Sequence, residues 1–160
     1  MADNIQKQSL RRLTYGLYIL TALEGGEMAA GTVSWLSQAS FKPPLIMVAI
    51  KAGSRLHNLI ERSGMMAVNV LAETQKEIAS VFIRPSSIEG EQINGYAIEP
   101  GPCTGAPLLK DLPAWFEARV TASIKKGDHT VFVAEVVNTG LRDPAARSLT
   151  MQDTGWHYGG

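Results

Sequence analysis

The sequence has one cysteine, Cys103, and no apolar run near the ~20 residues that a membrane-spanning helix needs. A single cysteine forms no internal disulfide. Without clustered histidines it is also a poor metal ligand, so a reducing cytoplasm is favoured. The polar N-terminal residues 1–8 lack the apolar segment of a signal peptide. We therefore expect a cytoplasmic protein with no membrane anchor and no metal site.

Neither sign of charge is in excess, because 15 basic residues face 15 acidic ones. Nucleic acids are bound by positive surfaces, so they are not expected partners. The G-x-G-x-x-G and Walker patterns are absent too, which excludes a dedicated dinucleotide-binding domain. The 160 residues suit one domain, which can bury roughly 70% of the surface that its unfolded chain exposes.

Short β-like segments dominate what is present, and the sequence predicts a mainly β fold with short helices. In the last long strand pair, alternation puts Phe116 and Ala118 on one face and Glu117 and Arg119 on the other. The expected strands are 15–23, 28–36, 45–50, 66–71, 96–99, 114–125 and 130–137, with a turn at Gly25 and Gly26 between the first two. Helices are expected at 4–13, packed on the sheet, after Ser54, and at 74–82, where Thr74 and Glu77 would form a capping box. We expect 84–95 to be a surface loop, 1–13 an N-terminal helix or arm and 152–160 a C-terminal tail.

The stretch Gly31–Ile50, GTVSWLSQASFKPPLIMVAI, contains an unusual connection between two strands. Pro43 and Pro44 lack the N–H groups that a strand ladder requires, so residues 37–42 are predicted as an irregular loop rather than a hairpin turn. Such a loop leaves amides and hydroxyls free to hold a ligand. A plain connector fits the same composition, because Ser, Gly and Pro mark turns more often than sites.

Ser54 follows a glycine turn and begins a predicted helix. A helix N-terminus presents free N–H groups and partial positive charge, which suit a phosphate. The alternative is that Ser54 only caps the helix and that His57 lies on the surface.

Two separated blocks carry a family resemblance. GTVSWLSQASFKPPLIMVAI, followed by Ser54, His57 and MAVNVL at 66–71, resembles the flavin reductase-like family, whose fold is an FMN-binding split β-barrel. GDHTVFVAEV at 127–136 is similar to the Gly-Asp-His signature of that family. The resemblance spans about residues 15–150. It departs from the family at 90–93, where GEQI replaces an Asp-Lys-Phe-like segment, so substrate choice is left open.

The resemblance also implies a binding site. His129 would lie close to flavin and nicotinamide, positioning the nicotinamide or stabilising charge rather than acting as an obligatory acid. By residue type alone, a histidine beside a Gly-Asp turn is more often a hydrogen-bonded structural residue than a catalyst. Backbone amides would hold the polar edge of the flavin, and hydroxyls with a helix start would hold its ribityl chain and phosphate. The implied cofactor-binding residues are Thr32, Val33, Ser34, Trp35, Ser37, Ser40, Lys51, Ser54 and His57.

The resemblance implies an NAD(P)H-dependent flavin reductase that binds FMN, or alternatively FAD, uses NADH or NADPH and forms a homodimer. An FMN-carrying electron-transfer protein of the flavoredoxin type, with a redox protein as partner, is the main alternative. A non-catalytic flavin- or haem-binding split barrel is the third. The tail around Trp156 and Tyr158 is compatible with fraying, with docking across a dimer interface and with stacking near a flavin edge.

Overall fold

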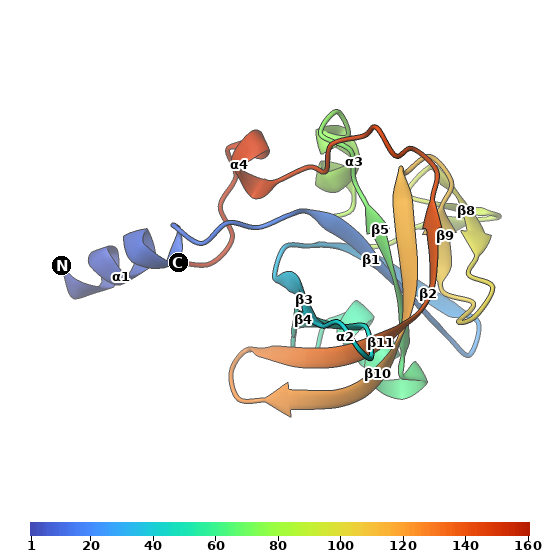
Figure 1. The fold of residues 1–160 in the computed structure, drawn as a ribbon, viewed down its shortest axis with the longest axis horizontal. Coiled ribbons are helices and arrows are strands. Elements are labelled where there is room, and N and C mark those ends of the chain that lie inside the picture. Colours follow the sequence, from blue (N-terminus) through green and yellow to red (C-terminus); the bar gives the residue numbers. More distant parts are fainter.

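The computed structural model describes residues 1–160 as a mainly antiparallel β structure (Figure 1). Seven strands form a large sheet in the order β2-β1-β5-β10-β11-β4-β3, and four short strands form a second sheet. The predicted mainly β fold is confirmed, but β2 and β3 are free edges, so the large sheet does not close on itself. The strands are β1 Tyr18–Glu24, β2 Glu27–Val33, β3 Leu36–Ser40, β4 Leu45–Lys51, β5 Met65–Val70, β6 Ile88–Glu89, β7 Gln92–Ile93, β8 Tyr96–Pro100, β9 Pro107–Leu109, β10 Ala114–Lys125 and β11 His129–Leu141.

The helices are short, and none has the length and apolar character that crossing a membrane would take. One of them, α2, lies against β1 and β2 and buries Leu56, Leu59 and Ile60 in the main core. A second core includes Leu17, Phe82 and Leu149, so it joins the two ends of the chain to α3 and the small sheet. The helices are α1 Ala2–Leu10, α2 Arg55–Ser63, α3 Lys76–Val81 and α4 Met151–Thr154.

The β1–β2 hairpin forms as predicted. Gly25 and Gly26 both have positive φ, at 56° and 81°, as the two central positions of a type I′ turn require. The register pairs Glu24 with Glu27. This short turn fixes β2, whose far end begins the candidate site.

The expected loop at 37–42 is wrong, because Leu36–Ser40 is the edge strand β3. It pairs with β4 from Leu36 opposite Val48 onward. Pro43 and Pro44 fall in the turn after the strand, so their missing N–H groups remove nothing from the ladder. The irregular backbone lies earlier, at Ser34 and Trp35, between β2 and β3.

Three other local expectations are corrected. The N-terminal helix α1 buries no residue and extends away from the body of the molecule (Figure 1). The capping box at Thr74 does not form, since α3 begins after Gln75, whose side chain instead bonds Ala72 and Asp111. The loop at 84–95 contains the small β6–β7 hairpin, and Ile93 there is fully buried in the second core.

Candidate functional site

A cleft of about 1010 Å³ opens on one side of the large sheet, at the upper end of the ~300–1,000 Å³ typical of ligand sites. Its walls come from β2 and the break after it, the β4–α2 junction, the segment after α3 and the C-terminal segment. The polar and aromatic lining residues are Thr32, Ser34, Trp35, Lys51, Ser54, Arg55, Phe82, Arg84, Ser86, Trp156, His157 and Tyr158.

The break between β2 and β3 supplies free hydrogen-bond donors to this cleft. Ser34 and Trp35 belong to neither strand, and no protein group accepts from their amides. Ser34 is only 5% exposed and Trp35 is half-buried, so the Ser34 amide in particular lies in a largely desolvated place. Thr32 differs, because its amide donates to Phe82 O and its hydroxyl to Ala79 O. Free amides in a dry cleft are suited to the polar edge of a ligand that gains negative charge.

The β4–α2 junction forms an anion-attracting end of the same cleft. Gly53 has φ +78°, which allows the sharp turn from the strand into the helix. Ser54 caps α2 as predicted, and its hydroxyl accepts from His57 N at 3.2 Å. The amides of Arg55 and Leu56 have no partner within the helix. Lys51 and Arg55 line the cleft beside them and add positive charge.

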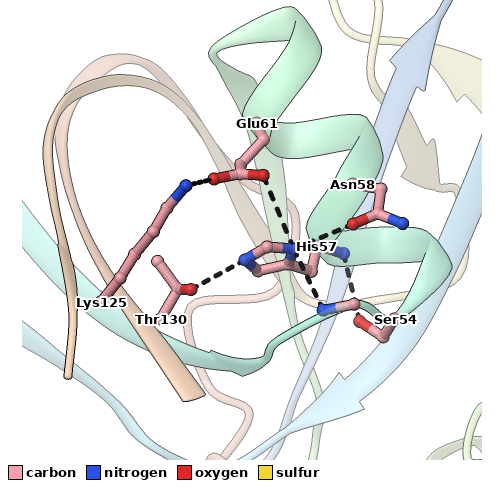
Figure 2. A network of polar contacts seen from close by, with 7 residues as sticks. Ser54, His57, Asn58, Glu61, Lys125 and Thr130 are labelled. Carbon is pink, nitrogen blue, oxygen red and sulfur yellow. Dashed lines mark hydrogen bonds and ion pairs between the residues drawn. The ribbon is translucent and has the colours of Figure 1, made fainter. Parts of the chain in front are cut away.

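His57 does not line the cleft; it is 5% exposed and lies behind the Gly53–Ser54 turn. Figure 2 shows its ring held among polar groups from two parts of the chain. Its Nε2 is 2.8 Å from Thr130 Oγ1, and its Nδ1 is 3.1 Å from Asn58 Oδ1. The alternative of a surface histidine is therefore wrong, and both ring nitrogens are engaged within the protein.

His129 begins β11 opposite Lys51 and sits in a small aromatic cluster. Its Nδ1 is 2.7 Å from Asp128 Oδ1 and its Nε2 is 2.7 Å from the Tyr158 hydroxyl. Its ring centroid is 4.6 Å from that of Trp35. His129 itself is not among the lining residues, whereas Trp35, Tyr158 and Lys51 are.

The protonation of this cluster follows from its hydrogen bonds. The hydrogen bond from His129 holds the pKa of the Asp128 carboxyl below its usual value. An ionised Asp128 is an acceptor for Nδ1–H, and the Tyr158 hydroxyl is the partner of Nε2. Burial raises the pKa of the Tyr158 hydroxyl, so this hydroxyl stays protonated and can donate. The ring of His129 is thus fixed at both nitrogens.

The C-terminal segment belongs to the site. Trp156, His157 and Tyr158 line the cleft, and the ring of Tyr158 lies 5.1 Å from that of Trp35. A Cβ on Gly159 would lie 2.6 Å from Trp35 Cζ2, so only glycine fits against the indole there. The glycine-flanked aromatic residues are conspicuous in the sequence, but the sequence alone did not predict that they line this cleft.

Two predicted residues lie apart from the cleft. Ser37 and Ser40 are on the edge strand β3, and neither lines it. The Ser37 hydroxyl donates to Gln38 O at 3.0 Å. Of the ten predicted site residues, the cleft lining brings together Thr32, Val33, Ser34, Trp35, Lys51 and Ser54.

A family model described as "flavin reductase like domain" matches residues 10–160. The chain belongs to the flavin reductase-like family. Among curated relatives, the NADH-dependent flavin reductase StyB of Pseudomonas fluorescens is 33% identical, with 88% of this chain and 79% of StyB covered. The solved structure of the styrene monooxygenase flavin reductase from Pseudomonas putida S12 has a TM-score of 0.76 and 28% identity, covering 94% and 93% of the two chains.

Some members of the family are much longer. Diflavin flavoprotein A 1 of Synechocystis sp. is 28% identical over 85% of this chain, but the match spans only 24% of that protein. The family domain therefore occurs both alone and as one part of a larger flavoprotein.

Proposed function

We propose that this flavin reductase-like chain transfers hydride from NAD(P)H to a flavin bound in the cleft. The proposal rests on the different chemistry of the two ends of the cleft. The unpaired amides of Ser34 and Trp35 lie at one, and Lys51, Arg55 and the start of α2 lie at the other. A flavin nucleotide has the matching polar ring edge and phosphate.

The residues present fit FMN in particular. One helix start with Lys51 and Arg55 suits a single phosphate, and apolar lining residues such as Ala30, Ile50 and Leu56 suit the ring system. The flavin, when bound, supplies the hydride-accepting ring. The chain binds it, keeps water out with apolar walls, and leaves room in a cleft of about 1010 Å³ for a nicotinamide beside it.

The first test is a spectrum. We expect the purified chain to bind FMN and to lose the flavin absorbance near the visible maximum when NADH or NADPH is added without oxygen. Turnover of free flavin by NAD(P)H supports the reductase. A chain that binds FMN tightly but is reduced only by another redox protein supports the electron-carrier alternative, which the diflavin relatives keep open. A chain that binds no flavin removes both.

A homodimer is part of the proposal. The β3 edge is unpaired, and Phe41 just after β3 and Met47 on the neighbouring strand β4 are 92% and 43% exposed. Exposed apolar side chains at a free sheet edge favour pairing with a second copy. Size-exclusion chromatography with light scattering should give about twice the chain mass. A monomer at micromolar concentration that still reduces flavin contradicts this part alone.

A further inference from the structure

Resting on the proposed function, we infer that His57 is a positioning residue for the flavin phosphate, acting through the Gly53–Ser54 turn rather than by contact. The imidazole lies between that turn and β11 (Figure 2). It is 5% exposed and lies outside the cleft lining, so a ligand in the cleft does not touch it.

The turn is held by His57 at both of its residues. The Gly53 amide lies 3.4 Å from His57 Nδ1 and donates to it in the tautomer whose Nε2–H donates to Thr130 Oγ1. The main-chain amide of His57 donates to the Ser54 hydroxyl at 3.2 Å. The imidazole therefore contacts the turn at Gly53, while the backbone of the same residue completes the cap at Ser54, where the proposed phosphate site begins.

The far side of the ring is anchored on β11. His57 Nε2 is 2.8 Å from the hydroxyl of Thr130, a residue that is 1% exposed and pairs with Ile50 of β4. No other hydrogen bond involves that hydroxyl. The Thr130 hydroxyl thus serves to fix the imidazole. Through it, the position of the turn is tied to the large sheet.

A second link between α2 and the hairpin provides a control. Glu61 on α2 forms an ion pair with Lys125 at the end of β10, on the more exposed side of the same network (Figure 2). That pair contacts neither Gly53 nor Ser54, although Glu61 Oε2 also lies 4.0 Å from His57 Nδ1. Changing Lys125 removes only the outer partner of the pair and leaves the contacts of His57 with Gly53 and Thr130 in place.

The experiment compares FMN with riboflavin, which lacks the phosphate, on the full chain freed of flavin. Replacing His57 itself would empty a buried position beside Phe132, so its partner is changed instead. Thr130→Val keeps the branched shape in the strand and removes only the hydroxyl. We expect the preference for FMN over riboflavin to fall about five- to tenfold, while riboflavin affinity changes less than about twofold.

Thr130→Ser, which retains the hydroxyl, and Lys125→Met should both keep the parent preference. If the folded Thr130→Val chain keeps it as well, the inference is overturned. Equal weakening of FMN and riboflavin overturns it too, in favour of a general structural role. A parent that binds both flavins equally removes the phosphate site but leaves the reductase intact. A parent that binds neither removes the proposed function and this inference together.

Discussion

Replacing Glu117 by alanine should lower the free energy of unfolding by about 2–4 kcal/mol at neutral pH. Glu117 lies on β10 and is fully buried. Its carboxylate accepts from the amides of Cys103 and Thr104, from the Thr104 hydroxyl and from the Asn138 side chain, at 2.7–3.1 Å. Without it, two loop amides and an Asn amide lose their acceptor. The loop from Gly101 to Ala106 should loosen.

The dependence on pH separates this carboxylate from a merely well-packed side chain. Burial raises the pKa of Glu117, but the hydrogen bonds from Thr104, Asn138 and Cys103 outweigh it, so the folded-state pKa lies below the usual value. The folded state therefore favours the ionised form. Its contribution is complete above the unfolded-state pKa of about 4.3 and is lost as pH falls through the folded-state pKa.

Urea unfolding at pH 7 and at acid pH measures both effects. The side-chain oxygen of Glu117→Gln can still accept some of these hydrogen bonds, so this variant should lose less stability than Glu117→Ala. The difference in free energy of unfolding between Glu117→Gln and the parent should shrink below about pH 4. Glu91→Ala, at an exposed position on the β6–β7 turn, should stay within about 0.5 kcal/mol of the parent. A Glu117→Ala chain as stable as the parent would show that water replaces the carboxylate without cost.

The features that the sequence predicted well are set by residues a few positions apart. The turn at Gly25 and Gly26 needs positive φ at both positions, and only its own two residues decide that. The cap at Ser54 depends on an amide three residues away. These local signals do not depend on distant residues, so the sequence alone is enough to predict them.

Burial of polar side chains could not be predicted, because it depends on distant partners. Strand alternation put Glu117 and its apolar neighbour Ala118 on opposite faces, yet both are buried, because Ala118 packs in the main core while the loop at Cys103 and Thr104 covers Glu117. His57 is buried, and its Nε2 finds its partner in Thr130, 73 positions away. The same holds for the tail, where Tyr158 meets His129 and Trp35 only after the sheet has assembled.

Replacing His129 by alanine should lower kcat/KM for NAD(P)H by about ten- to a hundredfold, with a smaller change in flavin affinity. The ring contacts Trp35 and is bonded to Tyr158, and both of these line the cleft. Its loss frees the aromatic wall against which a nicotinamide would lie. Misplacement by about 1 Å is enough for a loss of this size.

Matched variants show what His129 contributes. Tyr158→Phe removes the hydroxyl but leaves its ring against Trp35, so a smaller loss than in His129→Ala indicates that the imidazole itself is needed. Asp128→Asn removes the charge that fixes Nδ1–H and should fall between the two. Lys126→Ala, in the same exposed turn, should leave turnover unchanged. If His129→Ala keeps both flavin affinity and turnover, His129 is a structural residue of the turn and the nicotinamide is positioned elsewhere in the cleft.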